Sequence, residues 1–317
     1  MSVEGRRVGC VGFIPMKRFA PYLVLLAAML WATDAPFRVH LTKDLPVGFI
    51  VLVEHFFDCI ILLPLLIRQW TEIRSLGRKR WAAVIGIGVG GSALATLAFT
   101  ASFAYISPSV AILLQKLQPL VAITLAAVLL KEKITPRFAL WAVLALAGGY
   151  LISFPTLNPG ISFFGEMSGT LKGVLLALSA TVLWGASTVL GKYVLNGVHF
   201  HTMTTLRFFT AFLFLLVWVP VTGGGVELAS VSAMDWGYLA IIAMTSGVVS
   251  LYIYYRGLRD CPASVATLAE LGFPIAAVLI NRAFLDEKLV PVQILGMVLI
   301  LFAMWRLGRR NTLEDRG

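Results

Sequence analysis

Residues 109–136 read SVAILLQKLQPLVAITLAAVLLKEKITP, and residues 264–291 read SVATLAELGFPIAAVLINRAFLDEKLVP. The two stretches share an opening Ser-Val-Ala, a central proline, a Glu-Lys pair and a closing proline, each separated from its counterpart by 155 residues. Shorter matches lie upstream, where Leu-Trp recurs after 153 residues and Phe-Phe after 152. Self-similarity at a fixed long period is typical of a duplicated unit, so both halves of the chain are expected to fold alike.

Composition indicates the solvent in which this duplicated unit folds. Of the 317 residues, 59% are apolar and 13% are charged, against roughly 45–50% and about 25% in soluble domains. A soluble enzyme could not bury so much apolar surface in one core. The net charge of +10 is read as Lys and Arg in cytoplasmic loops rather than as a nucleic-acid site. The chain is therefore predicted to be an all-α polytopic membrane protein whose partners are a lipid bilayer and a small solute, without nucleic acid.

Apolar runs predict ten membrane-spanning helices, since each span needs about 20 residues. The uncharged run that begins at Trp81 is too long for one span, so Ile106-Ser107-Pro108 is predicted to turn between two helices. The predicted helices cover residues 19–33, 47–67, 81 to this turn, the turn to 130, 138–154, 171–195, 200–219, 236–255, 263–284 and 289–305. The expected domains are a cytoplasmic N-terminal segment (1–18), a first repeat (19–155), a connector (156–169), a second repeat (170–308) and a cytoplasmic basic tail (309–317).

Loop charges predict how the repeats lie in the membrane. With the N-terminus inside, nineteen Lys and Arg residues fall on cytoplasmic segments and five, Arg38 among them, on outside loops, which places both termini in the cytoplasm of a cell-membrane protein. Because each unit has an odd number of helices, the second copy must be inverted in the membrane relative to the first. The loop that contains Lys131 and Lys133 is basic, whereas its counterpart Asp286-Glu287-Lys288 is net acidic, as expected for opposite faces. Inverted repeats of this kind are a transporter architecture.

Two of these motifs carry a family resemblance. The stretch Leu-Leu-Lys-Glu-Lys-Ile-Thr-Pro at 129–136 and the stretch Leu-Trp-Gly-Ala-Ser at 183–187 resemble the EamA repeat, and the resemblance covers about residues 19–310. Two such repeats make the ten-helix drug/metabolite transporter superfamily. The resemblance implies a solute translocator of the inner or plasma membrane, often an exporter of amino acids or other metabolites.

Ionisable side chains inside apolar helices suggest a solute site, because such groups usually face a cavity or a partner. Glu54 and Asp58 are four residues apart and share one helix face, and Glu270 occupies the repeat position of Gln115. Both signs of charge would suit a zwitterionic solute, and the carboxylates could exchange protons. The alternative is that Lys116 and one acid form a structural ion pair. The predicted substrate-binding residues are Trp31, Glu54, Asp58, Gln115, Lys116, Trp184, Tyr254 and Glu270.

Prolines and glycines inside the spans suggest bends and close contacts. Pro119 and Pro274 remove a backbone donor at matching places and are predicted to kink their helices as hinges. Gly86-Ile-Gly-Val-Gly-Gly91 matches a dinucleotide-binding pattern but lies in an uncharged span, so close helix packing through Gly86 and Gly90 is favoured. No metal, phosphate-loop or cofactor spacing is present, and no cofactor is expected.

The sequence therefore predicts a secondary transporter and not an enzyme. It is expected to export small metabolites such as amino acids by alternating access, with protons as the candidate coupling ion. Two alternatives stay open. An intramembrane enzyme acting on lipid or peptide would need a nucleophile and a base, and a non-transporting structural or regulatory subunit would leave the duplication unexplained.

Overall fold

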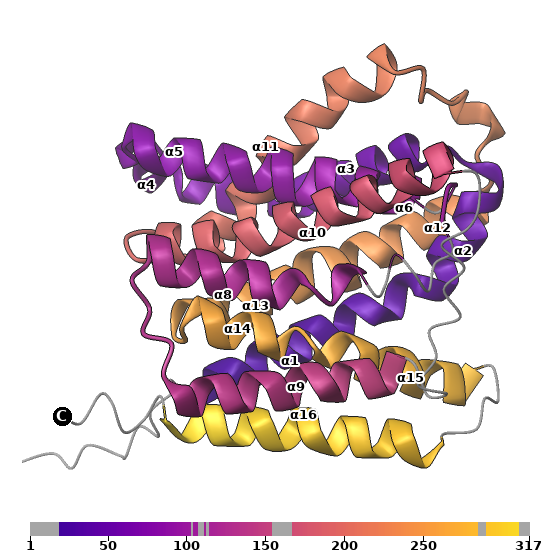
Figure 1. Ribbon diagram of the computed structural model, residues 1–317. Helices are drawn as coiled ribbons and strands as arrows, with labels where there is room; N and C mark the ends of the chain where they lie inside the picture. Colours follow the sequence, from indigo (N-terminus) through magenta and orange to yellow (C-terminus); the bar gives the residue numbers. More distant parts are fainter. Residues whose placement is uncertain are drawn as a thin grey trace, which may run out of the picture.

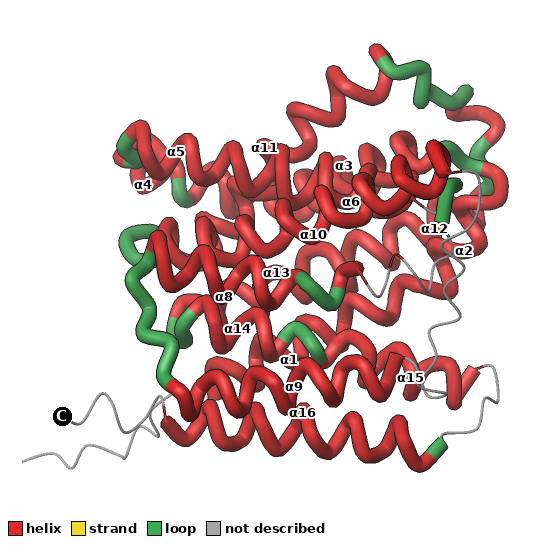
Figure 2. The backbone as a smooth tube through the Cα atoms, viewed as in Figure 1, coloured by secondary structure: helices red, strands yellow, loops and turns green. Residues whose placement is uncertain are grey.

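The computed structural model describes residues 19–102, 104–106, 111, 114–153, 167–284 and 290–310. In these residues every regular element is a helix (Figures 1 and 2). The predicted N-terminal segment, most of the connector and most of the basic tail lie outside the described residues. The start of α1 (Ala20–Trp31) and the end of α16 (Pro291–Arg310) lie at the same end of the bundle, at the left of Figure 1.

Among the described residues, six helical stretches are long and apolar enough to cross a membrane, and four further apolar helices are shorter. The prediction of an all-helical, multi-span chain is confirmed, while the number of ten spans stays a prediction. The remaining elements of the first half are α2 (Ala35–Asp44), α3 (Val47–Arg68), α4 (Trp70–Ser75), α5 (Arg78–Ile85), the π-helical η3 (Gly86–Leu94), α6 (Ala95–Ser102), α8 (Gln118–Leu129) and α9 (Pro136–Ser153). Those of the second half are α10 (Met167–Leu195), α11 (Phe200–Val221), α12 (Ala233–Ile242), the π-helical η5 (Ala243–Val249), α13 (Ser250–Arg259), α14 (Ala263–Ala269) and α15 (Gly272–Phe284). Each half also has a single-turn 3-10 helix, η2 (Ala32–Asp34) in the first and η4 (Leu228–Ser230) in the second.

Two helices are interrupted at matching places in the two halves. The chain leaves α-helical geometry at Lys116-Leu117, just before α8, and at Glu270-Leu271, between α14 and α15. Here the backbone closes tighter turns, with Leu117 N to Leu114 O at 3.1 Å and Leu271 N to Leu268 O at 3.2 Å. The prolines 119 and 274 follow in the first turn of the next helix, where a missing N–H leaves nothing unsatisfied. The break therefore lies just before each proline rather than at it.

Helices of the two halves pack against each other in reciprocal pairs. The first helix of one half packs on the third of the other, since α1 contacts α13 and α10 contacts α6. The second helices, α3 and α11, pack together, and so do the last helices, α9 and α16, at the bottom of Figure 1. The π-helical stretches follow the same rule, because η3 lies against α11 and η5 lies against α3.

Glycines permit the closest of these approaches, although not the pair that the sequence favoured. A methyl group on Gly88 would lie 2.9 Å from Arg207 O of α11, and one on Gly91 would overlap the Ser187 side chain of α10. Gly86 and Gly90 meet only leucine side chains of α10 at 3.7 and 3.3 Å. Helix packing through this glycine segment is therefore present, and its tightest approaches are at Gly88 and Gly91 rather than at Gly86 and Gly90.

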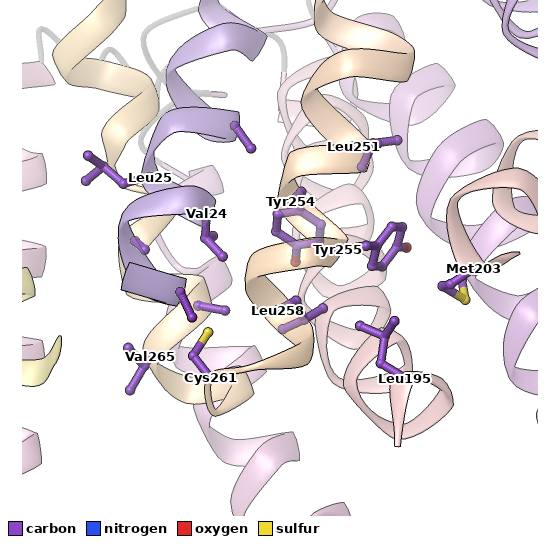
Figure 3. Packing of buried hydrophobic residues seen from close by; sticks show 14 of the residues in the cluster. Val24, Leu25, Leu195, Met203, Leu251, Tyr254, Tyr255, Leu258, Cys261 and Val265 are labelled. Carbon is purple, nitrogen blue, oxygen red and sulfur yellow. The ribbon is translucent and has the colours of Figure 1, made fainter. Parts of the chain in front are cut away.

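The distribution of side chains fits a bundle surrounded by lipid. Large apolar residues are exposed on the outside, among them Val221 at 78% and Val128 at 68%. The interior holds many alanines and hydroxyl residues, as expected where small side chains let helices approach. Around α13, aliphatic and aromatic residues fill the space between α1 and its neighbours, and Figure 3 shows Val24 and Leu25 on one side and Leu195 and Met203 on the other.

Two carboxylates of the first half cap helices of the second half. Glu132 accepts from Ala263 N at 2.7 Å, from Ser264 N at 3.1 Å and from Ser264 Oγ at 2.5 Å, at the start of α14. Glu72 of α4 accepts from the backbone N and ring Nδ1 of His199 and from the Thr202 hydroxyl, at the start of α11. Burial opposes ionisation of Glu72, but these hydrogen bonds outweigh it and lower its pKa. Glu132, the glutamate of the first Glu-Lys pair, and Glu72 thus each join the two halves of the chain.

We predict that Glu132→Ala destabilises the protein by about 1–2 kcal/mol, because the first N–H groups of α14 lose an ionised acceptor. The apparent melting temperature in detergent measures this effect. Lys133→Ala, at the exposed neighbouring position, is the control and should leave the melting temperature unchanged. Equal melting temperatures for the two variants would contradict the capping role.

Candidate solute-binding site

Glu270 lies at the break between α14 and α15 and gathers hydrogen bonds from three other helices. Tyr254 OH of α13 donates to its Oε1 at 2.8 Å, and Thr188 Oγ1 of α10 donates to the same oxygen at 3.1 Å. Gln118 Nε2, at the start of α8, donates to Oε2 at 2.6 Å. The cluster therefore joins the interrupted helix of one half to the interrupted helix of the other.

Aromatic rings border this carboxylate. The Trp31 ring, at the end of α1, lies 5.4 Å from the Tyr254 ring, and the Tyr254 ring lies 5.2 Å from that of Tyr255. Successive residues of a helix face different neighbours, so Tyr254 reaches Glu270 while Tyr255 points toward α11. There Arg207 Nη1 donates to Tyr255 OH at 2.9 Å and Arg207 Nε to Ser92 Oγ at 2.6 Å. Arg207 is thus held in a second polar group next to the first.

The donors to Glu270 are all neutral. In the part of the chain that the structure describes, the ion pairs involve other carboxylates, and Glu270 has an amide and two hydroxyls as partners. A carboxylate satisfied in this way can still accept a hydrogen bond from a solute N–H or O–H, since each carboxylate oxygen offers two acceptor positions. The site can therefore combine ring stacking with polar recognition.

Three other predicted residues, Gln115, Lys116 and Trp184, lie near this cluster without joining it. Lys116, in the break before α8, holds its Nζ 5.9 Å from the centre of the Phe273 ring instead of forming the ion pair considered from sequence. Gln115 is half-buried beside it. The Trp184 ring packs on Phe99 at 5.2 Å, one helical turn before Thr188.

Glu54 and Asp58 have different partners from Glu270. Glu54 pairs with Arg38 of α2 at 3.1 Å, and Asp58 packs against Gly247 of η5. The structure therefore divides the predicted residues into two groups, one around Glu270 and one around Glu54 and Asp58. Arg38 was expected in an outside loop, but it is helical and turned toward Glu54.

Sequence reasoning missed Gln118 and Thr188. Both are neutral polar residues in apolar runs, where they carry little signal of their own. The signal that the sequence did offer was their position, because Gln118 directly precedes Pro119 and Thr188 follows Trp184 by one helical turn. Its hydroxyl also lies 3.0 Å from Tyr254 OH, so it belongs to the same network.

The fold is that of a multi-span helical membrane protein with polar side chains gathered between its helices. Residues 18–154 and 171–308 each match the model of the EamA-like transporter family. The chain belongs to the EamA-like transporter family, and therefore to the drug/metabolite transporter superfamily. This family and the related proteins below are transporters, so the chain is not placed among enzymes.

Related proteins cover nearly the whole chain. The Riboflavin transporter ImpX of Fusobacterium nucleatum is 33% identical over 295 residues, which is 91% of this chain and 97% of that protein. The Uncharacterized transporter YetK of Bacillus subtilis is 21% identical over 92% of this chain and 87% of its own. A solved crystal structure with 15% identity superposes with a TM-score of 0.74 over 93% of this chain and 98% of its own, a likeness that shows the fold alone.

We predict that Tyr254→Phe and Thr188→Val lower the melting temperature non-additively, because both hydroxyls serve the same oxygen of Glu270. The double variant should lose less than the sum of the single losses. Ser179→Ala, at an exposed position of the same helix as Thr188, is the control and should add independently to Tyr254→Phe. Additive losses for Tyr254 and Thr188 would contradict a shared network.

Proposed function

We propose that this chain is a secondary transporter that carries a riboflavin-like solute, a neutral heteroaromatic ring with a polyhydroxyl chain. The observation that carries the proposal is the environment of Glu270, where an ionisable carboxylate, neutral hydrogen-bonding groups and an indole meet between the helices. The likeness to a riboflavin transporter over nearly the full length of both chains supports the same solute class.

The chemistry of such a solute matches these groups. A flat heteroaromatic ring stacks on Trp31 and Tyr254, since aromatic pairs attract beyond their buried area. An imide N–H of the ring donates to Glu270, and ring carbonyls or ribityl hydroxyls exchange hydrogen bonds with Gln118 and Thr188. Such polar contacts give selectivity, because a solute that lacks them leaves buried groups unpaired.

Amino acids are the second candidate, and one observation favours them. The Glu270 carboxylate has only neutral partners in the described contacts, so an α-ammonium group would supply a counter-charge. Lys116, whose Nζ lies over an aromatic ring, would be the cation for the α-carboxylate. A zwitterion needs both contacts at once, whereas a neutral heteroaromatic solute needs neither charge pair.

We further propose that movement follows from two five-helix repeats, inverted relative to each other, with both termini in the cytoplasm of a cell-membrane protein. Reciprocal packing between the halves and matching helix breaks support this arrangement. The breaks before Pro119 and Pro274 are the proposed hinges, because interrupted spans at a repeat interface both bind solute and bend. Rocking one half against the other would expose Glu270 to each side in turn.

Counterflow in proteoliposomes tests the solute. Vesicles loaded with unlabelled riboflavin should accumulate labelled riboflavin, and Glu270→Gln and Tyr254→Phe should each reduce the rate at least about tenfold, as expected when a buried polar contact is lost. Asp44→Asn, an exposed acid at the end of α2, is the matched control. Counterflow with amino acids but not with riboflavin would transfer the proposal to the second candidate, and counterflow unaffected by Glu270→Gln would reject the site.

Side-specific labelling tests the inverted arrangement. In a background without the native cysteines, Lys133→Cys and Val290→Cys occupy exposed positions of corresponding loops in the two repeats. A membrane-impermeant maleimide added outside intact cells should label Val290→Cys, and Lys133→Cys should react only after the cells are opened. Labelling of both positions from the same side would reject the inversion.

A further inference from the structure

A second polar group lies away from the proposed solute site, around Arg38. Arg38 Nη2 lies 2.9 Å from Asp34 Oδ2, and Arg38 Nη1 lies 3.1 Å from Glu54 Oε1. The Ser246 hydroxyl of η5 reaches the same Asp34 oxygen at 3.5 Å. The group thus joins α2 and α3 of the first half to η5 of the second.

Asp58 belongs to this group but has no counter-ion in it. It follows Glu54 by one helical turn and lies in the middle of α3, which runs from Val47 to Arg68. Its side chain is buried, at 2% exposure, and its Oδ1 has no hydrogen-bond partner. A methyl group on Gly247 would lie 2.5 Å from that oxygen, so the carboxyl group is packed directly against the backbone of η5.

Charge balance shows what Asp58 requires. This group holds three carboxyl groups, those of Asp34, Glu54 and Asp58, and the guanidinium of Arg38 is engaged with the first two. An unpaired charge in the middle of a spanning helix is unfavourable, and such groups pair, move a proton or bind an ion. A carboxyl group that carries a proton can remain in the packed contact with Gly247, whereas an ionised one needs a partner that the described contacts do not supply.

We propose that Asp58 is the proton-binding site that couples transport to a proton gradient, with Arg38 as the residue that responds to its charge. The proposal rests on the proposed transport function. With a proton bound, Asp58 is neutral and Arg38 stays with Asp34 and Glu54. When the proton leaves, the new carboxylate competes with Glu54 for Arg38 from the same helix face. Competition for one guanidinium weakens the hold of Arg38 on Asp34, whose carboxylate contacts Ser246 of η5.

The elements packed on α3 supply few other charges to this place. From α11 comes Arg207, which is engaged with Ser92 and Tyr255. From α12 come Asp235, which is held by Ser232 and lies 3.5 Å from His40, and Tyr238, whose ring packs on Phe37 and His40. The sequences of η5 and α6 contain no titratable residue. The remaining titratable groups on α3 itself and on α2, α4 and α11 are His55, Cys59, Arg68, Lys43, Asp44, Glu72, Arg74 and His201.

Transport under an imposed pH gradient tests the proposal. In proteoliposomes with the membrane potential clamped at zero, a gradient of one pH unit should shift the riboflavin accumulation ratio of the wild type by up to about tenfold for one-proton coupling. Asp58→Asn, which keeps the shape and removes the titration, should show a ratio near one while it retains counterflow. Asp44→Asn should respond as the wild type does. A normal response to the gradient in Asp58→Asn would overturn the proposal.

Further arms separate this proposal from its rivals. Loss of counterflow in folded Asp58→Asn would place Asp58 in the solute site and overturn the coupling role. Accumulation that requires sodium, and disappears when choline replaces sodium, would also overturn coupling to protons. Wild-type counterflow without any effect of the pH gradient would overturn coupling and leave the proposed function intact. Absence of counterflow with any solute would reject the proposed function itself.

A direct measurement of the proton does not depend on the solute. The infrared difference spectrum of purified protein between acidic and alkaline buffer should contain a protonated-carboxyl band that is missing in Asp58→Asn and unchanged in Asp44→Asn. Gly247→Ala should shift this band, because the added methyl group displaces the carboxyl group. A spectrum identical in wild type and Asp58→Asn would overturn the assignment.

Discussion

Lipid offers no hydrogen bonds, so a polar group placed among these helices is unfavourable unless it finds a partner within the protein. Glu270 shows how much structure this requirement determines. Its two oxygens take donors from α8, α10 and α13, and so one carboxylate fixes four helical segments relative to one another. Hydroxyl side chains elsewhere meet the same demand locally, as Thr204 and Thr205 do by donating to the carbonyl one turn earlier in α11.

This requirement acts between the halves as well as within them. Glu270 of the second half is held by Gln118 of the first, Arg207 of the second by Ser92 of the first, and Ala263 and Ser264 of the second by Glu132 of the first. Association of apolar surfaces contributes little in lipid, because the tails are as apolar as leucine. Polar contacts and close glycine packing are what remain to hold the two copies together.

The sequence predicted the helices well because apolar runs, and the charged residues that separate them, are local signals. It identified Glu270 and Asp58 because a carboxylate stands out in an apolar run. It could not identify Gln118 or Thr188, whose roles arise only when three helices meet. It placed Arg38 in a loop, since no local pattern shows that its guanidinium reaches Glu54 on the next helix.

The same limit applies to backbone detail. The prolines marked the interrupted helices, but the break lies before each of them because proline is accommodated in the first turn of a helix. Neither π-helical stretch had a sequence signature, although both lie in the third helix of their half. Periodicity thus located the elements, and tertiary packing decided their local geometry.

The cap formed by Glu72 has no equivalent at its repeat counterpart among the described residues. Glu227 lies 155 residues after Glu72, between an equivalent pair of helices in the second half, and its side chain is exposed. Six hydrogen bonds therefore fasten the Glu72 and Glu132 end of the bundle, three to each carboxylate. In the proposed cycle of alternating access, a fastening that Glu72 makes and Glu227 lacks would give the two access states unequal energies, so the carrier would rest facing one compartment even when no gradient drives it.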